Sequence, residues 1–233
     1  MADAAALLLL FDIDGTLLRR AAREHAVALH EAMHAVYGVD TREVKVEAAG
    51  RTDIEIARAT LLGAGVSALR IEERFGALRL AAAEAYARHV PDDLSATVNP
   101  GMVELLDRLA ARDDVLLSLV TGNLEPIARL KLRAAGLEAY FPAGQGGFGS
   151  DSEDRTDLPP IARRRAGTRD EPHPRERTVV IGDTPRDIAC ARADDLRVLC
   201  IATGPYPAAD LTGADAVVAD TAALGVELDR LLG

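Results

Sequence analysis

LLLLFDIDGTL, residues 7–17, carries the strongest structural signal in the chain. Its first five residues are an apolar run that predicts a short buried strand. Gly15 permits a sharp turn directly after that strand. Because side chains alternate along a strand, Asp12 and Asp14 are expected on one side at its carboxyl end. Open α/β sheets bind their ligands at that end, so the sequence predicts a functional site here.

Two carboxylates in one small site repel each other unless a cation or a proton separates them. Asp12 and Asp14 therefore suit a Mg²⁺ site in which one aspartate is a nucleophile and the other an acid/base group. The alternative is a surface turn that happens to contain two aspartates.

The length and composition indicate an ordinary globular protein. With 233 residues, the chain can bury one core, or one core plus a small second domain. Hydrophobic residues make up 48% and charged residues 27%, which argues against a disordered chain. The formal net charge of −10 argues against nucleic acid or an anionic membrane surface as a partner.

The sequence shows no signal for export or membrane insertion. No stretch approaches about 20 uninterrupted apolar residues, the length that spans a membrane. The run Leu7–Phe11 is too short for a signal-peptide core and lacks a basic region before it. Cys190 and Cys200 are expected as buried thiols rather than as a disulfide or a metal site. These features favour a cytoplasmic protein.

The chain divides into a helical segment and a segment of alternating strands and helices. Residues 21–90 show helical patterns only, with helices expected at 22–37, 52–63 and 67–89. Thr52 and Glu55 are expected to form a capping box at the start of the second helix. Asn99-Pro100-Gly101 then punctuates the chain.

Beyond that point the pattern predicts an α/β fold with a mainly parallel sheet, into which the helical segment is inserted. Strands are expected at 115–120, 178–181, 197–202 and 216–219, with helices beginning at Met102, Pro126 and Pro185. Gly144–Gly149 is expected to be a mobile loop. Arg163-Arg164-Arg165 is expected to form a solvated helix face.

Three later segments carry side chains suited to a phosphate and a cation. In Thr121-Gly122-Asn123, a hydroxyl followed by glycine and a helix amino terminus suits phosphate oxygens. Asp183 follows a predicted strand and Asp187 lies one turn into the next helix, so the two could hold Mg²⁺. The alternative for this pair is an N-cap aspartate and a surface aspartate. Lys131, in the helix after Thr121, suits a carboxylate–phosphate site.

In their order along the chain, these segments resemble the four motifs of the haloacid dehalogenase-like (HAD) hydrolase superfamily. Residues 12–16 are similar to the first motif, Thr121-Gly122-Asn123 to the second, Lys131 to the third, and Gly182-Asp183 with Asp187 to the fourth. The resemblance implies a Rossmann-like core domain of residues 1–18 and 99–233. It also implies an all-helical cap domain, residues 19–98, placed as in the phosphoglycolate phosphatase-like subgroup.

The third motif departs from the pattern of many relatives, which carry their lysine before a proline further along the chain. The corresponding region here, 148–155, contains no lysine. The role is therefore placed on Lys131, with Arg155 as the alternative. Leu18-Arg19-Arg20 also differs from the Asp-Ser that often follows the first motif. This difference weakens the assignment of any specific substrate from the resemblance.

The resemblance implies a Mg²⁺-dependent phosphatase that hydrolyses a small phosphorylated metabolite through an aspartyl-phosphate. Asp12 would be the nucleophile and Asp14 the acid/base group, with Thr121 and Lys131 completing the catalytic set. Metal ligands would be Asp12, the backbone carbonyl of Asp14, and Asp183, with Asp187 supporting the metal site.

The resemblance also implies how the substrate is held. Gly122 and Asn123 would bind the phosphoryl group. Arg51, between the first two cap helices, would contact an anionic group of the substrate. A solvated arginine is the alternative. The oligomeric state, monomer or homodimer, is left open.

Other functions must be weighed. Asp14 favours a phosphatase or a sugar phosphomutase over a dehalogenase, because a halide leaving group needs no proton. His25 lies near the place where a phosphomutase could carry an acid/base histidine. His30-Glu31-Ala32-Met33-His34 matches the His-Glu-x-x-His pattern of zinc metallopeptidases, although no third ligand is evident. A non-catalytic binding protein is the last alternative, but it would not be expected to keep every charged group of the site.

Overall fold

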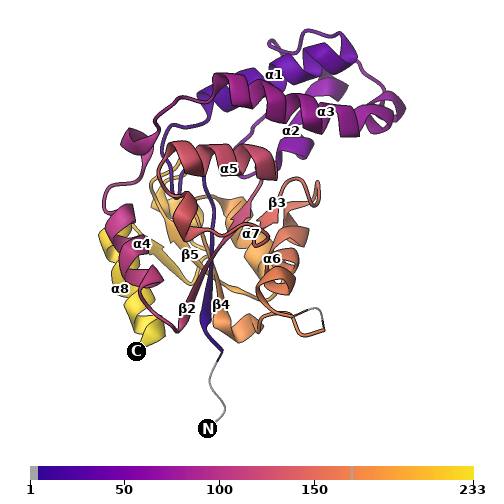
Figure 1. Cartoon of the computed structure of the whole chain (residues 1–233). Coiled ribbons are helices and arrows are strands. Elements are labelled where there is room, and N and C mark those ends of the chain that lie inside the picture. Colours follow the sequence, from indigo (N-terminus) through magenta and orange to yellow (C-terminus); the bar gives the residue numbers. More distant parts are fainter. Residues whose placement is uncertain (1–4, 169) are drawn as a thin grey trace.

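The computed structural model describes residues 5–168 and 170–233 and shows an α/β fold with a six-stranded sheet (Figure 1). The strands are β1 (Leu7–Phe11), β2 (Val115–Thr121), β3 (Gly147–Phe148), β4 (Thr178–Gly182), β5 (Arg197–Ile201) and β6 (Ala216–Val218). The helices are α1 (Arg23–Tyr37), α2 (Asp53–Gly63), α3 (Ala68–His89), α4 (Met102–Ala110), α5 (Glu125–Ala134), α6 (Leu158–Ala166), α7 (Pro185–Ala193) and α8 (Thr221–Leu232). Short 3₁₀ turns lie at Ser95–Thr97, Glu138–Tyr140, Arg155–Asp157, Arg175–Arg177 and Ala208–Leu211.

The six strands are all parallel to their neighbours, in the order β3-β2-β1-β4-β5-β6. This confirms the predicted α/β class with a mainly parallel sheet. The first strand lies at the centre, between β2 and β4, and four α-helices, α1 to α4, lie between β1 and β2 along the chain. Since parallel strands end at one edge, the loops after β1, β2 and β4 meet there.

The apolar run of β1 is explained by burial on both faces of the sheet. Leu7, Leu9 and Phe11 join the core formed with α4, α5 and α8. Leu8 and Leu10 join the core formed with α6 and α7. Figure 1 shows α4 and α8 on one side of the sheet and α6 and α7 on the other. A strand covered on both faces has no polar side, so its sequence does not alternate.

The predicted mobile loop at Gly144–Gly149 is wrong, because the structure has strand β3 there. Phe148 is fully buried, and β3 pairs with Val120 and Thr121 of β2. A Cβ atom on Gly147 would lie 2.3 Å from the carbonyl oxygen of Leu158. At this position glycine therefore serves close backbone packing rather than mobility.

Helices α1, α2 and α3 (residues 23–89), called the helical insert below, pack around a core of their own. Met33, Ile54 and Phe75 belong to this core. Leu124 and Ile127, at the start of α5, join the same cluster. The helical insert is therefore packed on the carboxyl edge of the sheet, above α5 in Figure 1.

The prediction that residues 163–165 form a solvated helix face is wrong for Arg163. Arg163 is buried, pairs with Asp194 at 2.9 Å and donates to the carbonyl oxygen of His173 at 2.7 Å. Arg164 is exposed, and Arg165 pairs with Asp151 at 2.6 Å. A buried guanidinium needs such partners, so Arg163 has a structural role.

The two cysteines, one in α7 and one in β5, are buried free thiols, as expected. Burial raises the pKa of both Cys190 and Cys200 to about 12, so both stay protonated at neutral pH. Across the described ranges, no helix combines the length and the apolar character needed to cross a membrane.

Candidate active site

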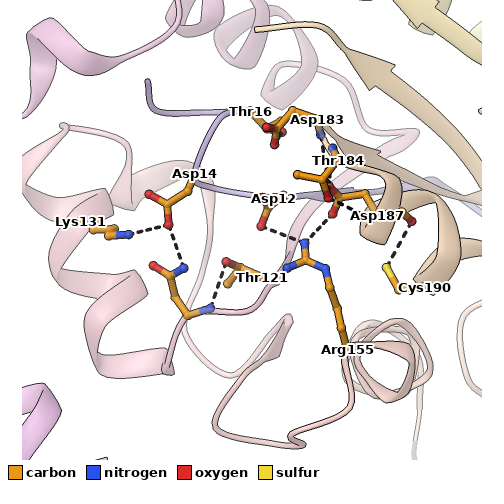
Figure 2. Close-up of polar contacts among 11 residues, drawn as sticks. Asp12, Asp14, Thr16, Thr121, Lys131, Arg155, Asp183, Thr184, Asp187 and Cys190 are labelled. Atoms are coloured by element: carbon orange, nitrogen blue, oxygen red, sulfur yellow. Dashed lines mark hydrogen bonds and ion pairs between the residues drawn. The ribbon is translucent and has the colours of Figure 1, made fainter. Parts of the chain in front are cut away.

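The candidate site lies at the carboxyl ends of three neighbouring strands (Figure 2). Asp12 follows β1, Thr121 ends β2 and Asp183 follows β4. Because β1 pairs with both β2 and β4, the sheet register places these residues beside one another. Lys131 comes from α5 and Asp187 from the first turn of α7.

The turn after β1 is fixed by close contact with the loop after β4. Gly15 has φ +94°, a conformation that favours glycine. A Cβ atom there would lie 2.1 Å from Oδ2 of Asp183. Thr16 donates its hydroxyl hydrogen to the other oxygen of Asp183 at 3.1 Å. Gly15 is thus required both by the turn and by the approach of the carboxylate.

Asp12, Asp183 and Asp187 form a group, called the carboxylate cluster below, that is arranged to hold a metal ion. One carboxylate oxygen of each lies within 4.8 Å of the others, and all three side chains are buried. Arg155 contacts Asp12 at 3.1 Å and Asp187 at 2.5 Å. In the described part of the chain, three carboxylates thus share one paired guanidinium, which leaves an excess of negative charge.

The pKa values of the carboxylate cluster reflect that excess. Burial is the largest cause of a pKa raised to about 7 at Asp12 and to about 9 at Asp183. Arg155 opposes the shift at both residues, while Asp187 adds to it. A divalent cation would reverse this effect, because a nearby positive charge favours the ionised carboxylate.

The chemistry of the donors fits Mg²⁺, a hard cation that prefers carboxylate oxygens. Oδ2 of Asp183 is buried and has no hydrogen-bond partner in the described structure. Asp187 differs, because its Oδ2 accepts the backbone N–H of Thr184 at 3.0 Å and the Thr184 hydroxyl at 2.7 Å. Its Oδ1 is held by Arg155. Asp12 and Asp183 could therefore hold an ion directly, with Asp187 behind them.

The contacts of Asp187 also settle the start of α7. Thr184, and not Asp183, is the N-cap residue, and Asp187 completes its capping box. The alternative of an N-cap Asp183 and a surface Asp187 is therefore wrong, since Asp183 and Asp187 are both fully buried.

Asp14 has a different set of partners. Lys131 Nζ contacts its Oδ2 at 2.5 Å, and Asn123 Nδ2 donates to the same oxygen at 2.9 Å. Burial alone would raise the pKa of Asp14, but Lys131, His25 and Asn123 together lower it below its ordinary value. Asp14 is therefore a carboxylate at neutral pH in this structure.

His25 and Asp53 connect the helical insert to this ion pair. Nδ1 of His25, on α1, lies 3.2 Å from Nζ of Lys131, and its Nε2 lies 3.1 Å from Oδ2 of Asp53. Asp53, the first residue of α2, also accepts the backbone N–H of Leu124 at 2.7 Å. His25, Asp53 and Lys131 are buried. Asp14, Lys131, His25 and Asp53 form one continuous polar chain, called the Asp14 network below.

The two candidates for the third motif thus occupy different halves of the site. Lys131 contacts Asp14, whereas Arg155 contacts Asp12 (Figure 2). Each carboxylate of the first motif has its own buried cation. The sequence treats the two as alternatives, and the structure places both in the site.

Thr121, Gly122 and Asn123 also reach the site, but they contact protein groups. The backbone N–H of Asn123 donates to Oγ1 of Thr121 at 3.3 Å. A Cβ atom on Gly122 would lie 2.1 Å from the carbonyl oxygen of Arg51. Gly122 therefore permits close contact between the core and the loop before α2.

Arg51 lies beside the site, where its guanidinium pairs with Glu55. Thr52 caps α2 as predicted, accepting the backbone N–H of Glu55 at 3.1 Å. The predicted capping box is incomplete, because the Glu55 carboxylate turns to Arg51 instead of the cap. Arg51 and both aspartates of the first motif line a cavity of about 670 Å³ between the helical insert and the core.

The His-Glu-x-x-His segment is not arranged as a metal site in the structure. His30 Nδ1 lies 2.7 Å from the hydroxyl of Thr41, whereas His34 Nδ1 lies 3.3 Å from the carbonyl oxygen of Val39. Glu31 pairs with two residues of α3. These partners account for the segment without zinc.

Sequence reasoning missed the roles of His25, Asp53 and Thr16. The sequence suggests His25 only as a phosphomutase residue. The contact between His25 and Asp53 joins positions 28 residues apart on two different helices, and no local spacing reveals it. Thr16 lies inside the first motif, which is the signal that could have placed it in the site, whereas its contact with Asp183 joins positions 167 residues apart.

The parallel α/β fold with an acidic first motif at the central strand defines the class as a HAD-like hydrolase. The sequence model of the haloacid dehalogenase-like hydrolase family matches residues 9–192. This chain belongs to that family.

Solved structures share the fold over almost the whole chain. A hydrolase from Pseudomonas syringae has a TM-score of 0.67 at 23% identity, covering 96% of this chain and 98% of that one. A protein from Bacteroides vulgatus assigned as a β-phosphoglucomutase has a TM-score of 0.65 at 22% identity, with coverage of 98% and 89%. CbbY from Rhodobacter sphaeroides, in complex with xylulose 1,5-bisphosphate, has a TM-score of 0.65 at 23% identity, with coverage of 94% and 96%. No curated protein sequence matches this chain.

Proposed function

We propose that this protein is a Mg²⁺-dependent phosphatase that hydrolyses a small phosphate monoester through an aspartyl-phosphate. One observation carries the proposal: the site is divided into a carboxylate cluster at Asp12 and a separate ion pair at Asp14. A nucleophile and an acid/base group need different environments, and two carboxylates in one site acquire them from their neighbours.

In the first half-reaction, a carboxylate oxygen of Asp12 attacks phosphorus and the bond from phosphorus to the substrate oxygen breaks. Asp14 donates a proton to that leaving oxygen. In the second half-reaction, Asp14 takes a proton from water, whose oxygen attacks phosphorus and releases phosphate and free Asp12. Arg155 orients Asp12, while Lys131 and Asn123 orient Asp14. Thr121 binds the phosphoryl group.

The charge of the phosphate controls the proton on Asp14. Lys131 holds Asp14 as a carboxylate in the structure, which is the form needed to activate water. An incoming phosphate brings negative charge close to Asp14 and raises its pKa. Substrate binding therefore favours the protonated form that the first half-reaction requires.

Asp12, Asp183 and the backbone carbonyl of Asp14 would hold Mg²⁺, with Asp187 supporting them. When bound, Mg²⁺ would offset the repulsion between these carboxylates and the phosphate. The unpartnered Oδ2 of Asp183 supports this assignment.

Residues 19–98 would act as a cap domain over a core of residues 1–18 and 99–233. The cavity between the helical insert and the core supports this proposal, since a cap excludes water from the intermediate and selects the substrate. Arg51 lines the cavity and would contact an anionic group of the substrate. That role stays a prediction.

A sugar phosphomutase of the same family is the second candidate, favoured by the buried position of His25 beside the Asp14 network. Both ring nitrogens of His25 already face protein partners, Lys131 and Asp53. No ring nitrogen is then left for a sugar hydroxyl, so the contacts of His25 support the phosphatase.

The test is to incubate the purified protein and Mg²⁺ with a panel of phosphate monoesters. Inorganic phosphate and free alcohol in equal amounts are expected. An isomeric phosphosugar without free phosphate would support the phosphomutase. No turnover of any ester, including p-nitrophenyl phosphate, would contradict both and favour a non-catalytic binding protein.

A further inference from the structure

The cavity over the site has an apolar part that the proposed chemistry does not use. Its volume of about 670 Å³ lies within the roughly 300–1,000 Å³ typical of small-molecule pockets. Beyond the catalytic residues, it is lined by a group called the apolar wall below: Leu29, Met33, Val44, Val46 and Ile56.

The apolar wall runs away from the catalytic residues along two helices. On α1, His25, Leu29 and Met33 are spaced by four and share one helix face. The rise of about 1.5 Å per residue places Leu29 about 6 Å and Met33 about 12 Å along the helix from His25. Since His25 contacts Lys131, the wall begins beside the Asp14 network.

The second helix repeats this arrangement. Asp53 contacts His25, and Ile56 and Thr60 follow at three and seven residues on the same face of α2. The Thr60 hydroxyl donates to the carbonyl oxygen of Ile56 at 2.7 Å. This hydroxyl is therefore already satisfied by the helix backbone.

The loop between α1 and α2 supplies the remaining two side chains. Val44 and Val46 are half-buried and line the cavity, whereas Glu43, Lys45 and Glu47 are exposed. This alternation turns apolar side chains inward and charges outward. Val44 also packs closely on α2, where a Cβ atom on Gly63 would lie 2.7 Å from its Cγ1.

The two polar side chains that line the cavity beside the apolar wall on α1 and α2, His30 and Thr60, already have partners. His30 is bonded to the Thr41 hydroxyl, and burial lowers the pKa of His30, so it is neutral at pH 7. Of the four arginines that line the cavity, Arg51 pairs with Glu55 and Arg155 with Asp12, whereas Arg19 and Arg20, in the turn before α1, are exposed. Sugar hydroxyls placed against the wall would lose water without gaining partners, which costs free energy.

We propose that the substrate is a phosphate monoester whose alcohol carries an apolar group, an alkyl chain or an aromatic ring, that occupies the apolar wall. This inference rests on the proposed phosphatase function and names its substrate class. The phosphate lies at Asp12, and the alcohol extends past His25 between α1 and α2. Burial of apolar surface then provides the selectivity.

The test uses ethyl, butyl, hexyl and octyl phosphate, whose leaving alcohols have similar acidity, below their micelle concentrations. With the full-length protein and Mg²⁺, kcat/KM should rise by about threefold for each methylene that enters the cavity. Ribose 5-phosphate should be at least about tenfold poorer than hexyl phosphate, because its hydroxyls lack partners. A flat series, or a preference for the sugar, would overturn the inference while leaving the phosphatase intact. No hydrolysis of any ester would overturn both.

A loop variant with a matched control tests the location. Val46→Asn should lower the ratio of kcat/KM for octyl over ethyl phosphate by about tenfold. Val27→Asn makes the same change on α1 at a position that is 47% exposed and outside the cavity, and it should keep the wild-type ratio. Because each ratio is measured within one variant, a folding defect cancels. An unchanged ratio in Val46→Asn would place the substrate elsewhere and overturn the inference.

Discussion

The carboxylate cluster, which is buried, and the Asp14 network, in which Asp14 itself is half-buried, lie side by side, yet their carboxyl groups respond in opposite ways. The pKa values of Asp12 and Asp183 are raised, whereas that of Asp14 is lowered. Burial acts in the same direction on all three. The difference comes from the charges around them, since three carboxylates share Arg155, while Asp14 has Lys131 to itself.

This difference separates two tasks within one site. A buried charge is stable only when it is paired, so the carboxylate cluster needs an added cation or a proton, and the proposed function supplies Mg²⁺. The Asp14 network is paired within the protein, and through His25 and Asp53 it also joins the helical insert to the core. We therefore expect variants of the two regions to differ in their response to Mg²⁺.

The largest effect is expected at the nucleophile. Asp12→Asn keeps the shape of the side chain but cannot form the aspartyl-phosphate, so kcat should fall at least about a thousandfold. Phosphate release measures the rate, and circular dichroism should show an intact fold. Asp92→Asn, on an exposed residue, is the matched control and should keep the wild-type rate. A rate within tenfold of wild type in Asp12→Asn would rule out the covalent mechanism.

Removal of the metal should be nearly as severe. Activity should vanish with a chelator and return with Mg²⁺, but less well with Ca²⁺, whose looser coordination misplaces the phosphate. Mg²⁺ at 100 times its Kd should also stabilise the fold by about 2.7 kcal/mol, measured as a rise in the thermal midpoint. This rise should be smaller in Asp183→Asn. A chelated enzyme with normal activity would contradict the metal assignment.

The next largest effect concerns the two buried cations, Arg155 and Lys131, whose variants should differ in their response to Mg²⁺. Arg155→Ala leaves three buried carboxylates without their guanidinium, which should destabilise the fold by about 3–5 kcal/mol. Added Mg²⁺ should recover more stability in this variant than in wild type, because it enters the same cluster. Thermal melts with and without Mg²⁺ measure the difference. Equal recovery in the two proteins would show that Arg155 and the metal act on separate groups.

Lys131→Ala should behave differently, because Lys131 contacts Asp14 rather than the carboxylate cluster. Its response to Mg²⁺ should match that of wild type. Without the ammonium, burial raises the pKa of Asp14, so this carboxyl loses its proton only at higher pH. The acidic limb of the pH profile for kcat should therefore move to higher pH. An unmoved limb would remove Asp14 from the base role.

The fold and the carboxylate cluster could be predicted because their signals are local. The run LLLLF predicts a buried strand, and Asp12 and Asp183 each directly follow a strand end. Adjacent parallel strands then bring these residues together without further information. The strand β3 was missed because the glycines in and around it suggest a turn, whereas Gly147 permits close packing with Leu158.

The Asp14 network could not be predicted in the same way. It joins side chains from the turn after β1 and from α1, α2 and α5, and the packing of the helical insert brings His25 and Asp53 to Lys131. Arg155 illustrates the same limit, because its contact with Asp12 depends on the position of the turn before α6. Residue type and spacing along the sequence determine neither the contacts of the Asp14 network nor the contact between Arg155 and Asp12.

The smallest effect is expected at Arg51, which lies where the helical insert meets the core. Its guanidinium is already paired with Glu55, so Arg51→Ala should change kcat/KM for p-nitrophenyl phosphate less than about threefold. Phosphoglycolate carries a carboxylate in addition to its phosphate. Because a charged hydrogen bond from Arg51 to that carboxylate would be lost, Arg51→Ala should lower kcat/KM for phosphoglycolate about tenfold more than for p-nitrophenyl phosphate. Glu55→Gln, which frees the guanidinium, should instead raise kcat/KM for phosphoglycolate relative to kcat/KM for p-nitrophenyl phosphate. Equal loss on both substrates in Arg51→Ala would assign Arg51 to folding or to the chemistry common to both substrates, and no loss on either would exclude it from substrate binding.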